Sequence, residues 1–217
     1  MVDDYSTDES YKKAKKFEKK DNRVKVIKLD KNYGYSKAKN EGIVISKGKY
    51  IVTLDADDML TIKSLEIRLK AIVEHGVDFV YANAYLVKGG ISLKDCYKSS
   101  SHRVNKSLDL YNIHAQSVMM KREVHIKYGL YDENLRSRSD REMWWRLFGN
   151  TKKDEKKVSS HYIDKPVAYY RYHRCSMWRK RKRTPKLDQK VIKMSEKAYK
   201  MRKKKGITKT NTRFLEK

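Results

Sequence analysis

Apolar and polar residues follow two different periods along the N-terminal part of the chain, and the two periods alternate. Residues 23–29 (RVKVIKL) alternate apolar and basic side chains, as a half-buried strand does. Residues 60–76 instead repeat apolar side chains every three or four positions, which is the period of an amphipathic helix, and Gly76 is a typical helix end. The pattern therefore predicts strands and helices in alternation.

The same two periods extend through most of the chain. A first helix is expected from an N-cap at Ser6 or Thr7 to about Lys20. The other predicted elements are helices over 35–48, 121–129 and 139–149 and strands over 49–55, 78–87, 115–120 and 165–173. Weak periodicity from Gly89 to about Ser107 predicts a loop. Strands and helices in this order are typical of an α/β fold with a mostly parallel sheet flanked by helices.

Carboxylates gather where two of the predicted strands end. Asp3 and Asp4 follow the short apolar start of the chain. Asp55, Asp57 and Asp58 lie at the end of the predicted strand over 49–55 and just after it. Ligands of such sheets bind beyond the carboxyl ends of the strands, and carboxylates at spacing i, i+2 can share one hard divalent cation. A D-x-D sequence on its own is more often a polar turn before a helix, so the surrounding motifs decide.

The net charge of the chain predicts an anionic partner. The chain has 53 Lys or Arg against 27 Asp or Glu, a formal net charge of +26. Such an excess indicates nucleic acid, acidic lipid or a phosphorylated small molecule, and it does not choose among them. Residues 171–217 hold 19 of the basic residues and 3 of the acidic ones, so more than half of the net charge lies in this tail.

The tail also carries a helical pattern. Apolar residues recur with 4-3-4-3 spacing at Leu187, Val191, Met194, Ala198 and Met201. One interpretation is a C-terminal helix packed on the domain with a solvated basic face. The other is peripheral contact with an anionic membrane through residues 179–205, to which each basic residue near the surface contributes roughly 1 kcal/mol.

The cysteines and the apolar runs bear on the cellular setting. Cys96 and Cys175 are too few for a disulfide framework or a cysteine zinc cluster, and reduced thiols are expected. Apolar runs fall short of the roughly 20 residues that span a bilayer, and the N-terminus lacks the apolar core of a signal peptide. A cytoplasmic location is expected, with any membrane contact peripheral at the surface.

Four separate motifs occur in order and together carry a family resemblance. They are VDDYSTD (2–8), NYGYSKAKNEGIVISKGKYIVTLDADD (32–58), SDREMWWRL (139–147) and YRYH (170–173). Over about residues 2–177 the chain resembles the family-2 inverting glycosyltransferases with the GT-A fold. The resemblance implies a metal-dependent enzyme that moves a sugar from a nucleotide-diphosphate donor, usually a UDP-sugar, to a hydroxyl acceptor.

The resemblance assigns the acidic clusters to the donor. Asp4, with Asp3 beside it, would accept a hydrogen bond from the nucleotide base, and Asp55 would lie near the ribose. Asp57 would bind Mn²⁺ or Mg²⁺ that bridges the diphosphate, and Asp58 is a neighbour whose role could be exchanged with that of Asp57. Carboxylates suit these tasks because they accept hydrogen bonds and bind hard cations.

Four further residues are implied in donor binding. Asn32 and Gly34 belong to the second motif, where a local role in the turn is equally open. Lys39 stands where the family usually has Arg; it keeps a positive charge for a phosphate but lacks the bidentate fork of a guanidinium. His173 of the YRYH motif corresponds to a histidine that lies near the metal and the diphosphate in relatives.

Inversion at the anomeric carbon needs a carboxylate that takes the proton from the acceptor hydroxyl. The resemblance assigns this role to Asp140, which by position alone could equally be a helix N-cap. The family normally has Glu-Asp here, whereas this chain has Ser139 before the aspartate. Glu142 is the fallback base. Trp144 or Trp145 could provide a sugar-stacking surface or anchor the core.

The resemblance also divides the chain. Residues 1–177 are expected to form the GT-A domain, with a nucleotide-binding half over 1–88 and an acceptor half over 89–177, and residues 178–217 a basic helix and tail. Family members normally carry a further strand and helix before the VDD motif, and we expect this chain to be truncated there. The expected partners are the nucleotide-sugar donor and a glycan, lipid-linked or protein hydroxyl acceptor.

Two alternatives stay open. Without the first strand of the sheet the protein could be a noncatalytic relative of these enzymes, because a missing central strand leaves backbone groups unpaired. A basic protein could instead bind nucleic acid through its tail. Nucleic acid is the less favoured partner, since the sequence holds no recognised reader motif.

Overall fold

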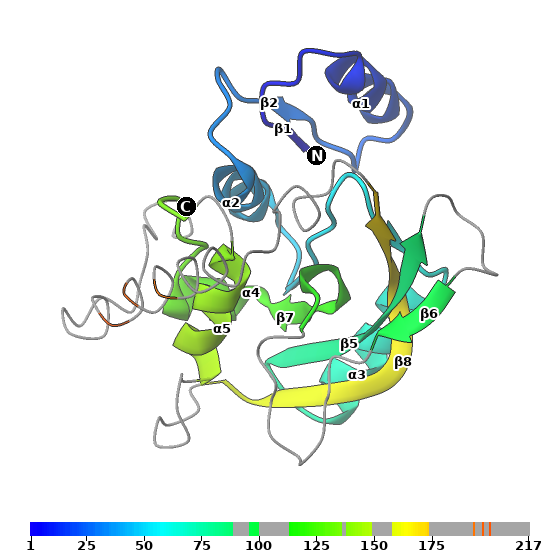
Figure 1. Ribbon diagram of the computed structural model, residues 1–217, viewed down its shortest axis with the longest axis vertical. Coiled ribbons are helices and arrows are strands. Elements are labelled where there is room, and N and C mark those ends of the chain that lie inside the picture. The colour runs from blue at the N-terminus through cyan, green and yellow to red at the C-terminus, as the bar shows by residue number, and fades with distance from the viewer. Residues whose placement is uncertain are drawn as a thin grey trace.

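A small two-stranded sheet and a larger six-stranded sheet organise the protein (Figure 1). The computed structural model describes residues 1–88, 96–99, 113–135, 138–148 and 158–173, together with Lys193, Lys197 and Lys200. In the small sheet, β1 (Val2–Asp3) and β2 (Ile27–Lys28) pair in parallel. The acidic turn of the first motif therefore follows directly after β1.

The larger sheet is mixed. Its strands lie in the order β3 (Tyr50–Ile51), β7 (Met119–Lys121), β5 (Phe79–Lys88), β8 (Ser160–Tyr172) and β4 (Met59–Leu60), and β6 (Cys96–Ser99) also pairs with β5. The β5–β8 pair is parallel, and the other described pairs of this sheet are antiparallel. The prediction of a mostly parallel sheet was therefore wrong, because the order of strands and helices along a sequence leaves the strand direction open.

Helices follow the predicted pattern. They are α1 (Ser10–Lys20), α2 (Tyr35–Ile45), α3 (Ser64–Glu74), α4 (Arg122–Tyr128) and α5 (Ser139–Phe148), and the 3-10 turn η2 (Ala115–Ser117) precedes β7. The five predicted helices are confirmed. The start of α1 is shifted from Ser6 or Thr7 to Ser10, since the carboxylate of Asp8 accepts a hydrogen bond from the Ser10 N–H (2.9 Å).

The strands of two to four residues differ most from the prediction. Residues 115–117 form a 3-10 turn rather than the first half of a strand, and residues 96–99 form β6 inside the predicted loop. The strand expected over 23–29 is shortened to β2, and β4 replaces an expected helix start. Such short strands contain too few residues for a two-residue period to be recognised.

Alternate residues of β5 pack on opposite faces of the larger sheet. Phe79 and Tyr81 belong to a buried cluster that includes residues of α5, whereas Val80 and Ala82 belong to a second cluster with Ile72 of α3. The two helices therefore cover different faces, and side chains at a strand period of two supply both cores.

The described part of the chain contains no helix long and apolar enough to cross a membrane. In the C-terminal tail, Lys193, Lys197 and Lys200 are helical and exposed. The remainder of 178–217, with the predicted apolar stripe and most of the predicted membrane contact over 179–205, lies outside the described residues.

Candidate functional site

Helix α2 connects the separate motifs, beginning with the acidic turn after β1. The carboxylate of Asp4 accepts hydrogen bonds from the backbone N–H groups of Tyr33 (2.8 Å) and Gly34 (2.7 Å). Gly34 is the N-cap of α2 with φ +93°, a backbone conformation that favours glycine. The side chain of Asn32 donates to the backbone carbonyl of Asp4 (3.1 Å). The structure thus brings together three of the predicted donor residues.

These contacts fix the direction of the Asp4 carboxylate. Each of its oxygens already accepts one backbone N–H, and a carboxylate oxygen has a second lone pair with which it can accept another donor. Asp3 has a local contact in the same turn, where its Oδ2 accepts the N–H of Ser6 (3.1 Å). Both aspartates are half-buried.

The middle of α2 contacts the acidic loop between β3 and β4. Nζ of Lys39 lies 2.9 Å from Oδ1 of Asp55. The same ammonium lies 4.2 Å from the ring centroid of Tyr35 and 5.9 Å from that of Tyr131, and the Lys39 side chain is only 9% exposed. Lys39 therefore engages Asp55 between aromatic rings, a partner that the motif alone did not indicate.

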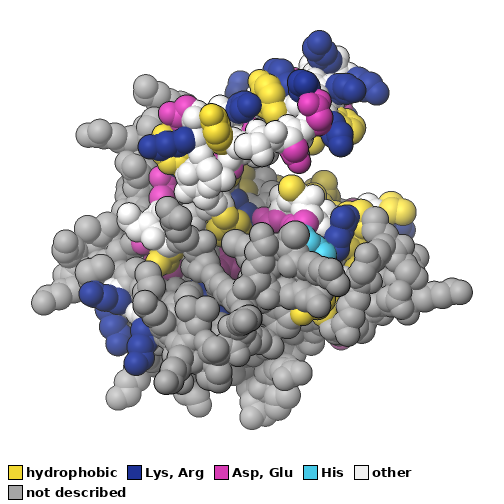
Figure 2. All heavy atoms as spheres, turned by 45° about the horizontal axis from the view of Figure 1, so that its top comes forward, with side chains coloured by type: hydrophobic (Ala, Val, Ile, Leu, Met, Phe, Trp, Pro, Cys, Tyr) yellow, Lys and Arg dark blue, Asp and Glu magenta, His cyan; other side chains and the backbone are white. Residues whose placement is uncertain are grey.

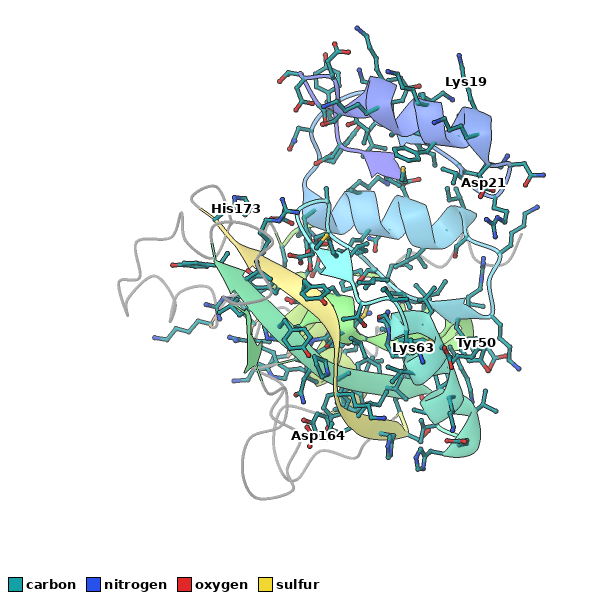
Figure 3. All side chains as sticks on the ribbon, turned by 90° about the vertical axis from the view of Figure 1, so that its right-hand side faces the viewer. Lys19, Asp21, Tyr50, Lys63, Asp164 and His173 are labelled. Atoms are coloured by element: carbon teal, nitrogen blue, oxygen red, sulfur yellow. The ribbon has the colours of Figure 1, made fainter. Side chains whose placement is uncertain are left out.

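Asp57 of the same loop meets His173 at the end of β8. Nε2 of the histidine lies 3.0 Å from Oδ2 of the aspartate, and both side chains are partly exposed. Figure 3 shows His173 at the end of β8, away from Asp164 at the other end of that strand. Figure 2 shows a histidine beside acidic side chains on the surface. The two residues that the family resemblance assigns to the metal are thus in contact.

Asp58 is the buried member of the acidic loop. Its side chain accepts the backbone N–H of Arg171 on Oδ1 (2.8 Å), and its Oδ2 has no hydrogen-bond partner among the described residues. Burial raises the pKa of Asp58 to about 7, and the carboxylates of Asp57 and Asp55 add to the increase. A cation beside this loop would stabilise the ionised form.

The residues of the loop fit a hard divalent cation. Carboxylate oxygens and an imidazole nitrogen are suitable ligands for Mn²⁺. Asp57 and His173, which are in contact, would supply one ligand of each kind. Among residues 1–88, 113–135, 138–148 and 158–173, no three Asp, Glu, His or Cys side chains converge as a metal site. Most of the coordination shell would have to come from a substrate and water.

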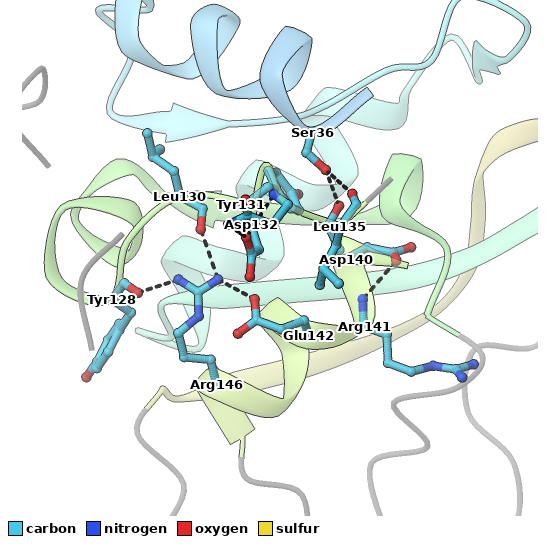
Figure 4. A network of polar contacts seen from close by, with 12 residues as sticks. Ser36, Tyr128, Leu130, Tyr131, Asp132, Leu135, Asp140, Arg141, Glu142 and Arg146 are labelled. Carbon is cyan, nitrogen blue, oxygen red and sulfur yellow. Dashed lines mark hydrogen bonds and ion pairs between the residues drawn. The ribbon is translucent and has the colours of Figure 1, made fainter. Parts of the chain in front are cut away.

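Helix α2 also holds the start of α5 (Figure 4). Oγ of Ser36 contacts the backbone carbonyl of Leu135 (3.0 Å) and Oγ of Ser139 (2.9 Å). One turn later, the side-chain amide of Asn40 donates to the carbonyl of Tyr131 and accepts the N–H of the same residue, both at 2.9 Å. These buried bonds fix α5 relative to the acidic loop.

Asp140 is the second residue of α5, and Figure 4 shows it close to Ser36 and Leu135. Its Oδ1 accepts the N–H of Arg141 (2.8 Å), and it accepts no other hydrogen bond from the described residues. The side chain is half-buried. A carboxylate with a free oxygen at a helix start can act as a proton acceptor, so the structure is compatible with the predicted base.

Three tyrosines are influenced by the charges of both Asp140 and the acidic loop. Burial raises the pKa of Tyr170 to about 12, and the carboxylates of the acidic loop and of Asp140 contribute. Burial also raises the pKa values of Tyr35 and Tyr131, with contributions from both Asp140 and Asp55. The charges of Asp55 and Asp140 therefore both reach these three phenols.

His114, which the sequence did not single out, lies beside Tyr170. Its ring lies 5.5 Å from that of Tyr170, and its backbone carbonyl accepts the N–H and the hydroxyl of Ser117. Burial lowers the pKa of His114, and the Asp140 carboxylate opposes that shift. No spacing pattern distinguishes this histidine from the others in the sequence.

Glu142 and Arg146 of α5 form an ion pair in the core. Glu142, the fallback base, is fully buried and pairs with Arg146 (2.8 Å), which also donates to the carbonyls of Tyr128 and Leu130 (Figure 4). It is therefore enclosed in the core away from solvent.

Both tryptophans of α5 are core residues. Trp144 and Trp145 are each 1% exposed, and Trp144 packs edge-on against Phe79 at 5.1 Å. A sugar could not stack on rings this buried, so the structure contradicts the interpretation of either as a sugar-stacking surface. Their buried rings instead pack α5 against the sheet.

Residues 1–129 match the family model of Glycosyl transferase family 2, and the chain belongs to this family. An uncharacterized glycosyltransferase of Methanocaldococcus jannaschii is 29% identical over 141 residues, which are 63% of this chain and 48% of that protein. The UDP-Glc:alpha-D-GlcNAc-diphosphoundecaprenol beta-1,3-glucosyltransferase WfgD of Escherichia coli is 24% identical over 122 residues, 56% of this chain and 47% of WfgD. The matched part thus spans about half the length of these relatives.

Solved structures share the fold. TarS of S. aureus in complex with UDP-GlcNAc aligns with a TM-score of 0.63 at 19% identity, covering 89% of this chain and 55% of that chain. The mannosyltransferase PcManGT from Pyrobaculum calidifontis, in complex with GDP-Man and Mn²⁺, aligns with a TM-score of 0.54 at 15% identity, covering 78% and 46%. The GT-A α/β fold expected from the motifs is confirmed.

Proposed function

We propose that the protein is a glycosyltransferase that moves a sugar from a UDP-sugar to a hydroxyl acceptor, with inversion and with a divalent cation. The observation that carries the proposal is the contact between Asp57 and His173 beside the buried carboxylate of Asp58. Family membership supports a glycosyltransferase over a nucleic-acid-binding protein.

The donor half would comprise residues 1–88 together with the end of β8. Asp57 and His173 would hold Mn²⁺ or Mg²⁺, and the bound cation would neutralise the charge that develops on the departing diphosphate. Asp55, held by Lys39, would accept hydrogen bonds from the ribose. Solved neighbours support a nucleotide-sugar donor and a cation, since the TarS structure is a complex with UDP-GlcNAc and the PcManGT structure a complex with GDP-Man and Mn²⁺.

The nucleotide base would lie against the turn after β1. Asp4, with Asp3 beside it, would accept the imide N–H of a uracil through an oxygen whose position is fixed by the backbone of Tyr33 and Gly34. Asn32 would keep the turn closed on α2. A preformed acceptor of this kind reduces the ordering that binding requires.

Asp140 would remove the proton from the acceptor hydroxyl on the opposite side of the sugar. A single displacement by that hydroxyl inverts the anomeric carbon, and the base must lie across the site from the leaving diphosphate. Tyr35 and Tyr131, whose pKa values are raised in part by both Asp55 and Asp140, support placing the two carboxylates near each other. The name of the relative WfgD contains a diphosphoundecaprenol acceptor, which supports a lipid-linked glycan as the acceptor class.

Turnover in the presence of Mn²⁺ tests this proposal. We expect the full chain to release UDP from a UDP-sugar, and Asp140→Asn to bind UDP normally while releasing at least about a hundredfold less, the lower range for a positioned general base. Glu9→Gln, an exposed carboxylate outside the site, serves as the control. Unchanged turnover in Asp140→Asn would contradict the assignment of the base.

A further inference from the structure

Helix α3 presents an apolar face to solvent. Leu65, Leu69 and Val73 recur every four residues, so they lie on one face of the helix, and they are 54%, 43% and 61% exposed. Ile62, just before the helix, is fully exposed and extends the face. We call these four residues the α3 stripe. Scattered exposed apolar residues need no explanation, but a contiguous row on one helix indicates a contact surface.

The helix cannot turn to bury this stripe. Arg68, on another face of α3, is completely buried and donates hydrogen bonds to the carbonyls of Gln116 (3.1 Å) and Val118 (2.9 Å) and to Oγ of Ser64 (2.7 Å). Rotation of α3 would separate this buried guanidinium from the carbonyls of Gln116 and Val118, which is costly. The outward position of the stripe is therefore fixed by the fold.

Charged residues flank the stripe along one side. Lys63, Glu66, Lys70 and Glu74 are all exposed, and their signs alternate along the helix. The side chains of Lys70 and Glu74 lie 3.7 Å apart and are 70% and 56% exposed. Two positive and two negative side chains in alternation give the flank no net charge.

Both the stripe and the charged flank are symmetric about the middle of the helix. Counted outward from residues 67 and 68, Ile62 is as far from the centre as Val73, and Leu65 as far as Leu69, to within about one residue or 1.5 Å of helix rise. The same centre relates Glu66 to Lys70 to within about one residue and Lys63 to Glu74 to within about two residues, or about 3 Å of helix rise, which these long side chains can span. In each charged pair the two signs are opposite.

We propose that a second copy of this chain covers the α3 stripe, with the two α3 helices antiparallel across a two-fold axis near residues 67 and 68. A two-fold contact pairs each residue with its symmetric counterpart, so apolar residues meet apolar residues and each lysine meets a glutamate of the second copy. An anionic membrane is a poorer occupant, because the flank offers it no net positive charge.

The contact is small. One helix face provides less than the roughly 800 Å² per partner that is usual in a stable complex, so the dimer is weak and depends on concentration. Sedimentation velocity of the full chain over a wide range of concentrations measures it. We expect the sedimentation coefficient to rise from monomer to dimer with concentration, and Leu69→Glu to remain monomeric. Phe17→Glu, which alters an exposed apolar residue of α1, is the matched control and should dimerise like the original chain.

A charge exchange distinguishes this dimer from other contacts. Lys70→Glu places like charges opposite each other twice and should weaken the dimer about tenfold, given up to about 1 kcal/mol for each exposed pair. The double variant Glu66→Lys with Lys70→Glu recreates opposite pairs and should restore the association. All these positions are exposed, and equal melting temperatures confirm that the variants are folded.

Four results would overturn the proposal. A chain that stays monomeric at every concentration has no such contact. A dimer unaffected by Leu69→Glu lies on another surface, and a double variant weaker than Lys70→Glu excludes the antiparallel pairing. Binding of the stripe to anionic vesicles by a monomeric chain, lost in Leu69→Glu, would assign the surface to lipid instead.

Discussion

Nε2 of His173 lies 3.0 Å from Oδ2 of Asp57, although the two residues are 116 positions apart in the chain. The antiparallel pairing of β4 with β8 produces this contact, because Leu60 pairs with Ala168 and Met59 with Tyr169. If the same pairing is continued beyond Met59 and Tyr169, the end of β8 lies alongside the acidic loop. A strand of two residues thus joins the second and fourth motifs.

Lys39 should be required for both folding and donor binding. In Lys39→Met the stem remains but Asp55 loses its partner, and we expect a loss of about 1 to 2 kcal/mol in the free energy of unfolding, since Asp55 is partly exposed. UDP affinity should fall about tenfold because the carboxylate is no longer positioned. Denaturant titration and calorimetry measure the two effects.

Lys39→Arg is the matched control for this change. It keeps the positive charge and should retain most of both properties. Wild-type UDP affinity in Lys39→Met would show that Asp55 is positioned without the ammonium.

Glu142 should be structural. Glu142→Gln removes the carboxylate that Arg146 contacts at 2.8 Å in the core, and we expect stability to fall by about 3 to 5 kcal/mol, the cost of breaking a buried ion pair. Replacing both residues, as Glu142→Leu with Arg146→Met, should recover part of the loss. If Glu142→Gln were as stable as the original chain, the pair would contribute nothing. Urea denaturation measures each variant.

The buried His125 should make the protein less stable in acid. Burial lowers its pKa from 6.5 to about 4, so the unfolded chain binds a proton that the folded chain does not between these values. Stability from this residue is therefore complete above about pH 6.5 and is lost towards pH 4, by on the order of 3 kcal/mol. In His125→Leu the pH dependence of the unfolding free energy should be flatter across this window. An unchanged slope would contradict the shift.

The sequence predicted the helices better than it predicted the sheet. Each helix is long enough for its period of apolar residues to be recognised. The motif residues Asp4, Lys39 and Asp57 were identified by resemblance. Their partners could not be predicted in the same way. The backbone N–H groups that hold Asp4 and the rings around Lys39 come together only when α2 has packed.

The strand directions and the buried residues of α5 show the same limit. Nothing in the residues of β7 indicates that it runs antiparallel to β5, because the alternation of side chains is equal in both directions. The burial of Trp144 and Glu142 depends on how α5 lies on the sheet. A sequence motif identifies such residues without telling which of them face a substrate.

Calorimetric titration of UDP into the full chain, with Mn²⁺ and with a chelator, tests the proposed cation site most directly. We expect affinity that depends on Mn²⁺, its loss in Asp57→Asn, and a reduction of about 10- to 100-fold in His173→Gln. Asp140→Asn, the control, should bind as the original chain does. Equal UDP affinity with and without Mn²⁺, or in Asp57→Asn and the original chain, would contradict a cation held by Asp57 and His173.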